Sequence, residues 1–314
     1  DLVVGAGSYS SSQGRIYIFN NNGSYPADAT SADEIITGEA INNFFGESFI
    51  IDDLDADGDD DLAVGAFWYN GSQGRVYVFY NDGAYTSLAS SADDIITGES
   101  GSRFGKSLST GDFNADGEVD LAISGYFYNS SRGRIYVFYN DSSYPVSATS
   151  ADEIITGESS GYEFGNSLVA GDFNADSKMD LAIGASSYNL DNTGRVYIFY
   201  NDGTYGNSAT SAEVIITGDA NNSFGLSLSA GDLSQNGKTD LIVGSYGWVY
   251  VFYNDGYYPV SMSGADIELT GENGGGYFGN SSIIEDMNID GIDDLIVGDY
   301  NYNSQQGRVY IYIN

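Results

Sequence analysis

The chain has 314 residues, with 45 Asp and Glu against 10 Lys and Arg, a formal net charge of −35, and neither Cys nor His. This balance excludes nucleic acid as a partner, because phosphate binding needs Lys and Arg. Disulfides, thiolate metal sites and histidine general bases are excluded by composition. Because the sequence contains no apolar run of about 18 residues, we expect no direct membrane insertion.

Short apolar runs rich in Val, Ile, Tyr and Phe begin at the first residue and recur throughout the chain, which is typical of β-strands. The opening run 1–6 (Asp-Leu-Val-Val-Gly-Ala) returns with variations at 61–66 (Asp-Leu-Ala-Val-Gly-Ala) and from residues 120, 180, 240 and 294. A second run follows each of these after a polar loop, as at 74–80 (Gly-Arg-Val-Tyr-Val-Phe-Tyr). An Asn-Asp-Gly turn at 81–83 and a run ending in Ile-Ile-Thr-Gly at 95–98 complete the unit.

Phe-Gly pairs mark the start of the repeat, which therefore has four strands: A (after Phe-Gly), B, C and D. The pairs lie at Phe45, Phe104, Phe164, Phe224 and Phe278. Because a four-stranded unit of this size cannot bury both faces alone, the pattern predicts an all-β β-propeller of four-stranded antiparallel blades. A solenoid is the rival architecture.

We expect one domain over 1–314, with repeats starting near 45, 104, 164, 224 and 278 and a partial repeat over 1–40. The runs supply six B and six C strands but only five A and five D strands. We therefore predict six blades with incomplete terminal blades, and a seven-bladed ring as the runner-up. We expect the chain to be a segment of a longer polypeptide.

The loop between strands A and B carries the strongest chemical signal. Residues 112–120 place oxygen-bearing side chains at positions 1, 3 and 5, Gly at position 6 and Asp at position 9. This spacing suits a hard cation that takes six to eight oxygen ligands, with the carbonyl of position 7 filling the shell. Five loops share the pattern. The predicted ligands are Asp53, Asp55, Asp57, Asp59 and Asp61; Asp112, Asn114, Asp116, Glu118 and Asp120; Asp172, Asn174, Asp176, Lys178 and Asp180; Asp232, Ser234, Asn236 and Asp240; and Asp286, Asn288, Asp290, Ile292 and Asp294.

Oxygen ligands without Cys or His favour Ca²⁺, and we expect about four to five structural ions. Magnesium ranks second, because it prefers a smaller octahedron that keeps several waters. An EF-hand is excluded, because position 12 lacks Glu and the flanking runs are strands. The fourth loop, with two carboxylates, is expected to bind most weakly, and solvated Asx turns without metal are the alternative.

The pattern Phe-Gly … Asp-x-Asn-x-Asp-Gly-x-x-Asp-Leu-x-Val-Gly-Ala resembles the FG-GAP repeat of integrin α-subunit propellers and related surface proteins. The resemblance covers essentially the whole chain, but the Pro of Gly-Ala-Pro is missing from every copy, with Phe67 or Ser186 in its place. The resemblance implies ligand recognition on the rim opposite the metal loops. The candidate ligand-binding residues in the B–C loops there are Trp68, Tyr69, Tyr126, Tyr128, Tyr188, Tyr300 and Tyr302. Trp68 and Tyr69 are the ones we most expect to be exposed, and packing between blades is the alternative for the rest.

The resemblance and the metal loops together predict a non-catalytic, calcium-binding adhesion or interaction module that is extracellular or on the cell surface. Its partner is expected to be an extracellular protein or a glycan. A calcium-dependent lectin-type propeller and a structural component of a surface filament or coat are the alternatives. An enzyme is disfavoured, because the carboxylates are better explained as metal ligands and no His, Cys or nucleophile motif stands out.

Overall fold

A computed structural model describes residues 1–272 and 277–314. The chain is an all-β, six-bladed β-propeller built of small antiparallel sheets. The predicted six blades, with incomplete first and last blades, are confirmed: among the described residues four sheets have four strands and two have three. The chain divides into two compact units, residues 1–129 with 134–154, and residues 130–133 with 155–314.

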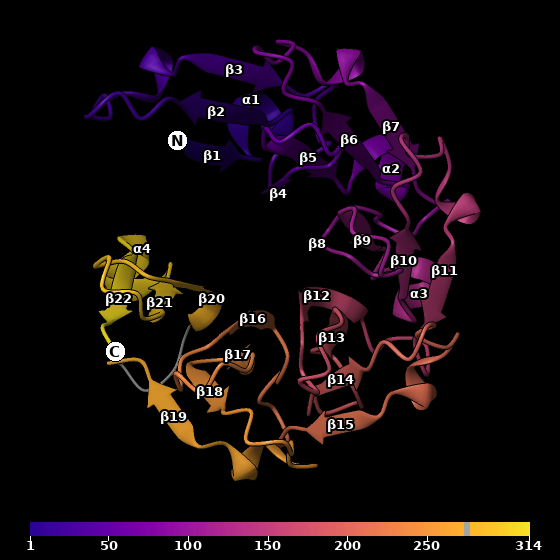
Figure 1. Ribbon diagram of the computed structural model, residues 1–314, viewed down its shortest axis with the longest axis vertical. Helices are drawn as coiled ribbons and strands as arrows, with labels where there is room; N and C mark the ends of the chain where they lie inside the picture. The colour runs from indigo at the N-terminus through magenta and orange to yellow at the C-terminus, as the bar shows by residue number, and fades with distance from the viewer. Residues whose placement is uncertain (273–276) are drawn as a thin grey trace. The chain divides into compact units, whose positions relative to one another are not determined.

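Strands of the first three sheets follow chain order within each sheet (Figure 1). Short α-turns connect strands B and C, and 3-10 turns (η) precede strand D. The elements are β1 (Leu2–Ala6), α1 (Tyr9–Ser12), β2 (Arg15–Phe19), η1 (Ala29–Ser31) and β3 (Glu34–Thr37); β4 (Ser48–Asp52), β5 (Asp61–Ala66), α2 (Tyr69–Ser72), β6 (Arg75–Phe79), η2 (Ala89–Ser91) and β7 (Asp94–Thr97); and β8 (Leu108–Gly111), β9 (Asp120–Ser124), α3 (Tyr128–Ser131), β10 (Arg134–Phe138), η3 (Ala148–Ser150) and β11 (Glu153–Thr156).

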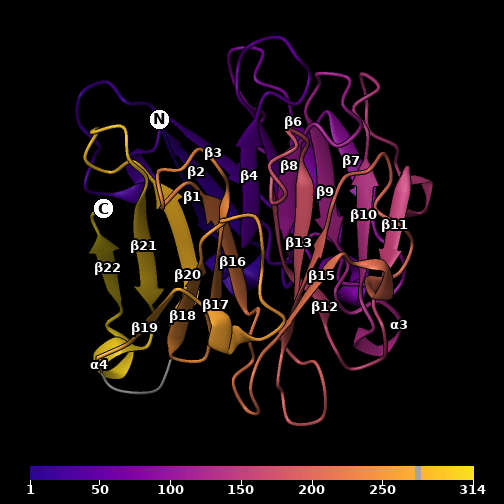
Figure 2. The same ribbon diagram turned by 60° about the horizontal axis from the view of Figure 1, so that its bottom comes forward.

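The remaining three sheets keep the strand order, but in the described residues no α-turn joins strands B and C of the fourth and fifth sheets, and the sixth sheet has three strands. Figure 2 shows β20, β21 and β22 side by side, with α4 where the chain turns from β21 into β22. The elements are β12 (Phe164–Gly171), β13 (Asp180–Ala185), β14 (Arg195–Phe199), η4 (Ala209–Ser211) and β15 (Val214–Thr217); β16 (Ser227–Gly231), β17 (Asp240–Ser245), β18 (Trp248–Phe252), η5 (Met262–Gly264) and β19 (Ile267–Thr270); and β20 (Phe278–Glu285), β21 (Asp294–Asp299), α4 (Tyr302–Gln305) and β22 (Arg308–Tyr312).

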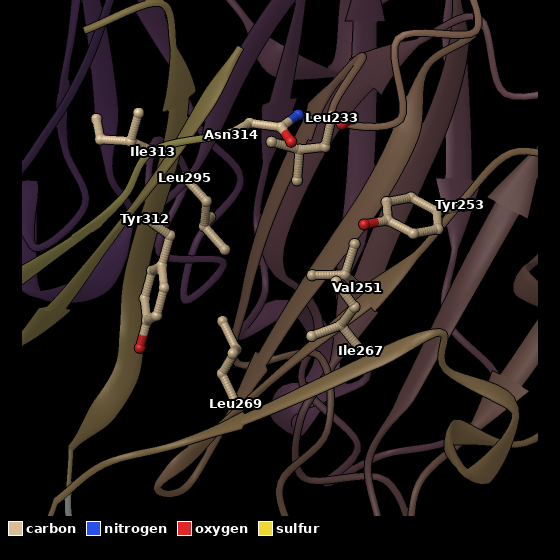
Figure 3. A pocket seen from close by; sticks show the side chains of 9 residues that line it. All are labelled: Leu233, Val251, Tyr253, Ile267, Leu269, Leu295, Tyr312, Ile313 and Asn314. Atoms are coloured by element: carbon tan, nitrogen blue, oxygen red, sulfur yellow. Dashed lines mark hydrogen bonds between the residues drawn. The ribbon is translucent and has the colours of Figure 1, made fainter. Parts of the chain in front are cut away.

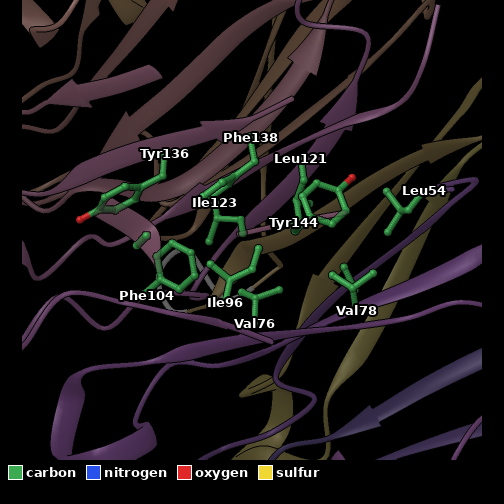
Figure 4. Packing of buried hydrophobic residues seen from close by; sticks show 12 residues of the cluster. Leu54, Val76, Val78, Ile96, Phe104, Leu121, Ile123, Tyr136, Phe138 and Tyr144 are labelled. Carbon is green, nitrogen blue, oxygen red and sulfur yellow. The ribbon is translucent and has the colours of Figure 1, made fainter. Parts of the chain in front are cut away.

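Strand C shows why each blade needs neighbours. Successive side chains of a strand point to opposite faces. In β6, Val76 and Val78 join one buried cluster with Phe104 (Figure 4). Tyr77 and Phe79 join a different cluster on the other face. Both faces of a central strand are therefore buried, as the aromatic and β-branched composition predicts.

Two glycines let adjacent blades approach at the Phe-Gly pair. A Cβ on Gly65 would lie 2.1 Å from the carbonyl oxygen of Gly105, and one on Gly74 would lie 2.2 Å from that of Phe104. Gly74 also has φ +81°, which disfavours any side chain. Phe104 itself is fully buried and makes an edge-on contact with Tyr136 at 5.3 Å. The repeated Phe-Gly is thus a packing motif between blades.

Membrane insertion finds no support in the helices, since none in the described part of the chain has the length and apolar character to cross a bilayer. The α-turns are four residues each. In α2, Asn70 and Gly71 have φ 49° and 68°, so the turn is built partly from left-handed residues.

Candidate metal centres

The five A–B loops have the same backbone hydrogen bonding, which draws the acidic side chains inward. In the first loop, the Asp53 carboxylate accepts the N–H groups of Asp57 and Gly58, both at 3.1 Å. Asp57 in turn accepts the N–H of Asp59 at 2.9 Å. The position-4 residue, Ala56, has φ 61°, and Gly58 has φ 96°. These left-handed residues make the tight turn that brings positions 1, 3 and 5 together.

Equivalent contacts recur in the other four loops. The position-1 aspartate accepts the N–H groups of positions 5 and 6 each time, at 2.7 to 3.1 Å. The substitution of Ser177 for Gly in the third loop is tolerated with φ 68°. The residues at position 7 donate their N–H to position 5, namely Asp59, Glu118, Lys178, Lys238 and Ile292. The Lys178 ammonium donates to the Asn201 carbonyl at 3.0 Å. Because an ammonium has no lone pair to offer, only the backbone carbonyl of Lys178 can bind a cation.

The closing aspartates are the buried members of the loops. Asp61 is 1% exposed and Asp120, Asp180, Asp240 and Asp294 are 0% exposed. One carboxylate oxygen of Asp120 accepts the N–H of Phe113 at 2.8 Å, and the other accepts that of Asn140 at 2.8 Å. The remaining closing aspartates each accept backbone N–H groups from the loop and from the residue after strand C in the same way. The closing residue therefore ties strand B to the loop and to the end of strand C.

Burial also perturbs the ionisation of these groups. Desolvation raises the pKa of Asp61, Asp120 and Asp180 from 3.8 to about 6, although the backbone donors act in the opposite direction. Desolvation likewise raises the pKa of Asp240. In the first loop, the charges of Asp55 and Asp57 add to the rise at Asp61. The first four loops are therefore short of positive charge, which a divalent cation would supply.

We predict that the cation-free protein loses stability as pH rises. Between about pH 4 and pH 6 the folded state holds protons on Asp61, Asp120 and Asp180 that the unfolded chain has released, so unfolding becomes easier with rising pH. Melting after removal of metal on a chelating resin should show a falling melting temperature from pH 4.5 to 7. The same series in calcium is the control, because the ion stabilises the ionised form. A melting temperature that rises equally with pH in both series would contradict the prediction.

Loop one fits a cation most directly. One carboxylate oxygen from each of Asp53, Asp55 and Asp61 lies within 4.8 Å of the other two. In loops two and three the position-3 amide is turned toward position 5: Asn114 donates to Asp116 at 2.9 Å and Asn174 to Asp176 at 3.2 Å. The all-oxygen donor set suits Ca²⁺, whose ligands are carboxylates, amide oxygens and backbone carbonyls. The buried aspartate clusters are thus consistent with metal sites, and the predicted ligand sets remain predictions.

In loop four, the Asn236 side chain donates to the Asn254 carbonyl at 3.0 Å, and the Ser234 hydroxyl donates to Asp240 at 3.3 Å. Its two carboxylates, Asp232 and Asp240, are present with the same backbone turn. Loop four therefore has the same backbone turn as the other loops but fewer carboxylate groups.

Asparagines just after strand C bind backbone carbonyls of the metal loops in the preceding repeat. From the sequence they were predicted only to form turns. Asn140 donates from its amide to the Leu54 carbonyl at 2.8 Å, and Asn254 donates to the Phe173 carbonyl at 3.0 Å. These carbonyls belong to position 2 of the preceding repeat's loop, and Leu54 and Phe173 are buried. Each such amide therefore joins one metal loop to the next blade. The asparagine recurs after strand C in each repeat, as at Asn81, Asn140, Asn201 and Asn254, and this recurrence is a signal that could have revealed the pairing.

Arginines of strand C hold most of the predicted ligand-binding tyrosines on the opposite rim. The guanidinium groups of Arg75, Arg134, Arg195 and Arg308 each stack on the tyrosine of their own B–C loop and pair with a glutamate of the preceding repeat. Arg75 lies 3.8 Å from the Tyr69 ring centroid and 3.2 Å from Glu39. Arg stacking recurs at Tyr128, Tyr188 and Tyr302, each at 3.7 Å, and the ion pairs recur at Glu99, Glu158 and Glu272. These tyrosines therefore have a structural role in each blade.

The other predicted aromatic residues differ in exposure. Trp68 is half-buried beneath Arg103, whose guanidinium lies 4.3 Å from a ring centroid of the indole. Tyr126 is buried, and its hydroxyl accepts a hydrogen bond from Arg103. Tyr300 is 54% exposed. The expectation that Trp68 and Tyr69 would be the exposed pair is thus not met, because arginines cover both rings.

The fifth sheet departs from this scheme. Trp248 stands where the other blades have Arg, and the B–C loop is reduced to Tyr246 and Gly247. Trp248 is 38% exposed and Tyr246 is 48% exposed. Tyr277 lies 6.4 Å from Tyr246 and 4.4 Å from Tyr300 between ring centroids. Tyr246 is one of the aromatic residues that the sequence places in the B–C loops. Trp248 was not predicted, although the missing Arg of the Gly-Arg motif marks its position.

Family models match three stretches of the chain. The model described as FG-GAP repeat matches residues 164–199 and 224–257, and the model described as FG-GAP-like repeat matches residues 53–123. Among curated proteins, the chain is 33% identical over 180 residues to integrin alpha-PS2 of Drosophila melanogaster, which covers 52% of this chain and 12% of that protein. It is 33% identical over 158 residues to integrin alpha-7 of Rattus norvegicus, covering 48% and 13%.

An enzyme is also among the relatives. Phosphatidylinositol-glycan-specific phospholipase D of Homo sapiens is 31% identical over 155 residues, covering 46% of this chain and 18% of that protein. In all three relatives the matched part is less than a fifth of the relative's length. The Phe-Gly packing motif, the five aspartate loops and these matches together show that the chain contains FG-GAP repeats, with distant similarity to integrin α subunits and to phosphatidylinositol-glycan-specific phospholipase D.

Proposed function

We propose that the chain is a non-catalytic, calcium-binding interaction module of the cell surface or extracellular space. Structural Ca²⁺ occupies the A–B loops, and the opposite rim recognises an extracellular protein or a glycan. The observation that carries this proposal is the repeated loop in which a buried closing aspartate is tied to the loop backbone, together with the raised pKa values of Asp61, Asp120 and Asp180, which call for a compensating cation. The similarity to integrin α subunits supports an interaction role.

The calcium concentration outside cells supports the proposed extracellular location. Extracellular calcium modules typically work with dissociation constants of about 10⁻⁴ to 10⁻³ M, far above resting cytosolic calcium. The net charge of −35 opposes binding to nucleic acid. The proposal assigns no reaction to the chain, because the acids with perturbed pKa values are those that the loop backbone already orients for a cation.

A calcium titration by calorimetry tests the proposal. Metal-free protein should bind about four to five ions, the weakest at loop four because that loop has only two carboxylates. The substitution Ser234→Asp adds a third carboxylate at position 3 and should strengthen the weakest site about tenfold. Gln235→Asp is the matched control, because it adds the same charge at position 4, outside the ligand pattern. No calcium binding, or equal effects of the two substitutions, would refute the assignment of the loops.

A glycan ligand is the second candidate, and the aromatic cluster of the fifth and sixth sheets favours it. Tyr246, Trp248 and Tyr300 are exposed aromatic side chains, a residue type that stacks on sugar rings. Nearby, Asn222 donates to the Tyr250 hydroxyl at 3.2 Å, while its buried side-chain oxygen has no hydrogen-bond partner. A buried acceptor beside exposed aromatic rings suits a hydroxyl-rich ligand.

Glycan-array binding by Trp248→Ala protein distinguishes the ligand classes. We expect the variant to lose binding at least tenfold, whereas Trp68→Ala, which alters an Arg-covered aromatic of another blade, should bind normally. Loss of binding in Trp68→Ala alone would place the site in the B–C loop at 67–69 instead. A silent array with calcium-loaded wild-type protein would favour a protein ligand.

A further inference from the structure

A polar cavity lies between the first and second sheets, on the rim that carries the B–C loops. Its volume is about 470 Å³. Residues 40–43, in the loop between β3 and β4, line one side, and residues 68–71, at the start of α2, line the other. Among these described lining residues are three asparagines and no charged side chain. The cavity therefore suits a neutral part of a ligand that forms hydrogen bonds.

A second cavity, between the fifth and sixth sheets, differs in chemistry. Its volume is about 140 Å³, and apolar side chains such as Val251, Leu269 and Leu295 line most of it (Figure 3). The one amide among its described lining residues, Asn314, already donates to the Leu233 carbonyl. This cavity therefore lacks an amide that is open to a ligand.

Asn43 is a buried amide without a hydrogen-bond partner in the protein. It is 6% exposed and lines the polar cavity. Its backbone carbonyl accepts the N–H of Trp68 at 3.4 Å, but its side chain makes no hydrogen bond in the described part of the chain. Ser102 stands at the same place before the next Phe-Gly pair, and its hydroxyl donates to the carbonyls of Gln73 and Glu99. Because an unpaired buried amide is costly, Asn43 is suited to pair with a ligand.

Arg103 contacts the same tryptophan. Its guanidinium lies 4.3 Å from a ring centroid of Trp68 and 3.8 Å from that of Phe127. Nη1 donates to the Tyr126 hydroxyl, and the buried Nε has no partner among the described residues. Four arginines of strand C each pair with a glutamate, whereas Arg103 forms no ion pair in the structure as described. This half-buried guanidinium therefore has unused donors, which a carboxylate would accept.

The backbone at this position does not require an arginine. Arg103 stands directly before its Phe-Gly pair and has φ 53°. The equivalent residues Phe44, Glu163 and Ser223 have φ 56°, 57° and 52°. The repeat thus keeps one backbone conformation and varies the side chain. A variable side chain in a loop on a constant scaffold is a common place for recognition.

The local charges permit an acidic ligand despite the net charge of −35. Lys106 pairs with Glu47 and Arg75 pairs with Glu39, both at 3.2 Å, so these charges are balanced. Arg103 is then a positive charge with no paired acid among the described residues. At physiological salt, exposed charges more than about 8 Å away are largely screened.

We propose that Arg103 and the polar cavity form one docking site for an extended acidic segment of a partner polypeptide. An Asp or Glu carboxylate of the partner pairs with Arg103, and Asn43 pairs with a backbone peptide group. An apolar side chain of the partner contacts Ile41, which lines the cavity and is 60% exposed. Trp68 joins the two parts, because it lines the cavity and stacks on Arg103. The inference rests on the proposed interaction role and specifies the chemistry of the partner at this part of the rim.

A polypeptide is favoured over a sugar by the positions of two arginines. Arg103 stacks on Trp68, and Arg75 stacks on Tyr69 at 3.8 Å. The arginines therefore occupy ring faces on which a sugar would stack. Asparagine amides and an exposed isoleucine remain, and these suit peptide groups and an apolar side chain.

An array of capped hexapeptides tests the inference. Each peptide combines one Asp or Glu with one Leu, Ile or Phe, at every spacing and in both orders, and a matched set has Asn or Gln in place of the acid. Calcium-loaded protein at 150 mM salt should bind the best acidic peptide at least tenfold more tightly than its amide counterpart, as measured by fluorescence anisotropy. Arg103→Ser should abolish this preference, and Ile41→Ser should weaken binding at least fivefold.

Arg132→Gln is the matched control for the loss of one positive charge. Gln13 and Gln73 stand at the equivalent position of the first and second repeats, and each donates to a glycine carbonyl as Arg132 does. The variant should therefore fold and bind the peptide as the wild type does. Arg103→Lys keeps the charge without the planar group, and it should retain part of the preference for acidic peptides.

The inference is overturned if no acidic peptide binds, if the amide peptides bind equally well, or if Arg103→Ser and Arg132→Gln have the same effect. Loss of the preference in Arg103→Lys as complete as in Arg103→Ser would assign the effect to stacking and would also overturn it. Binding of uronate-bearing glycans through Arg103, with no peptide bound, would exclude a polypeptide partner. The calcium titration tests the proposed function separately, so calcium binding without a preference for acidic peptides would refute this inference alone.

Discussion

Removal of calcium with excess chelator is expected to lower the melting temperature by roughly 15 °C or more. Each site filled at about a hundredfold its dissociation constant stabilises the folded state by about 2.7 kcal/mol, and four such sites act together. For a chain of this size about 1 kcal/mol corresponds to roughly 2 °C. Without the ion, buried aspartates such as Asp120 and Asp180 remain next to other carboxylates with no compensating charge.

Differential scanning calorimetry in 10 mM calcium, about a hundredfold excess over a dissociation constant of about 10⁻⁴ M, and in 5 mM EDTA measures this effect. Magnesium at the same concentration is the comparison, and we expect it to restore only part of the stability, because the loops offer more oxygens than an octahedron needs. Sodium chloride at matched ionic strength controls for screening of the net charge. An identical melt with and without calcium would show that the loops are stable acidic turns and would remove the basis for the proposed metal sites.

The substitution Asp120→Ala is expected to destabilise the protein by on the order of 4 kcal/mol in calcium. The carboxylate accepts the buried N–H groups of Phe113 and Asn140, and each orphaned donor costs about 1–3 kcal/mol. The lost charge also weakens the second metal loop. In EDTA the same substitution should cost less, because removing a buried carboxylate also removes its desolvation penalty.

Glu118→Ala in the same loop is the control for Asp120→Ala. Glu118 stands at position 7, where the predicted ligand is the backbone carbonyl, and its N–H bond to Asp116 does not depend on the side chain. Urea unfolding in calcium should place this variant within about 0.5 kcal/mol of the wild type. Equal losses in the two variants would mean that position 9 has no special role. If Asp120→Ala fails to fold, Asp120→Asn, which keeps one acceptor oxygen, provides the comparison.

The sequence permitted most of the fold to be predicted because its information is local and repeated. Alternation within runs such as Val76-Tyr77-Val78-Phe79 specifies strands buried on both faces, and turn residues such as those at 81–83 bound them. Because the unit recurs, the strand assignment of any one repeat can be checked against the other repeats. The metal loops are likewise local, since one turn of nine residues supplies the complete candidate ligand set.

The exposure of the rim could not be predicted in this way. Tyr69 and Tyr128 look available in a polar loop, but each lies under an arginine from strand C that also pairs with a glutamate of the preceding repeat. Trp248 lacks this arrangement, and its exposure follows from a deletion in the loop before it. Cation–π stacking joins residues that the local pattern does not relate.

By itself the sequence determined the repeat, the strand order within each unit and the positions of the acidic loops, because these depend on periodicity and turn chemistry over a few residues. Only the tertiary structure decided which aspartates are buried, that Asn140 and Asn254 hold the loop of a preceding blade, and which aromatic side chains reach solvent. The physical reason is distance along the chain. Desolvation and contacts between blades join residues more than 80 positions apart, such as Asn140 and Leu54, and no local pattern encodes those pairs.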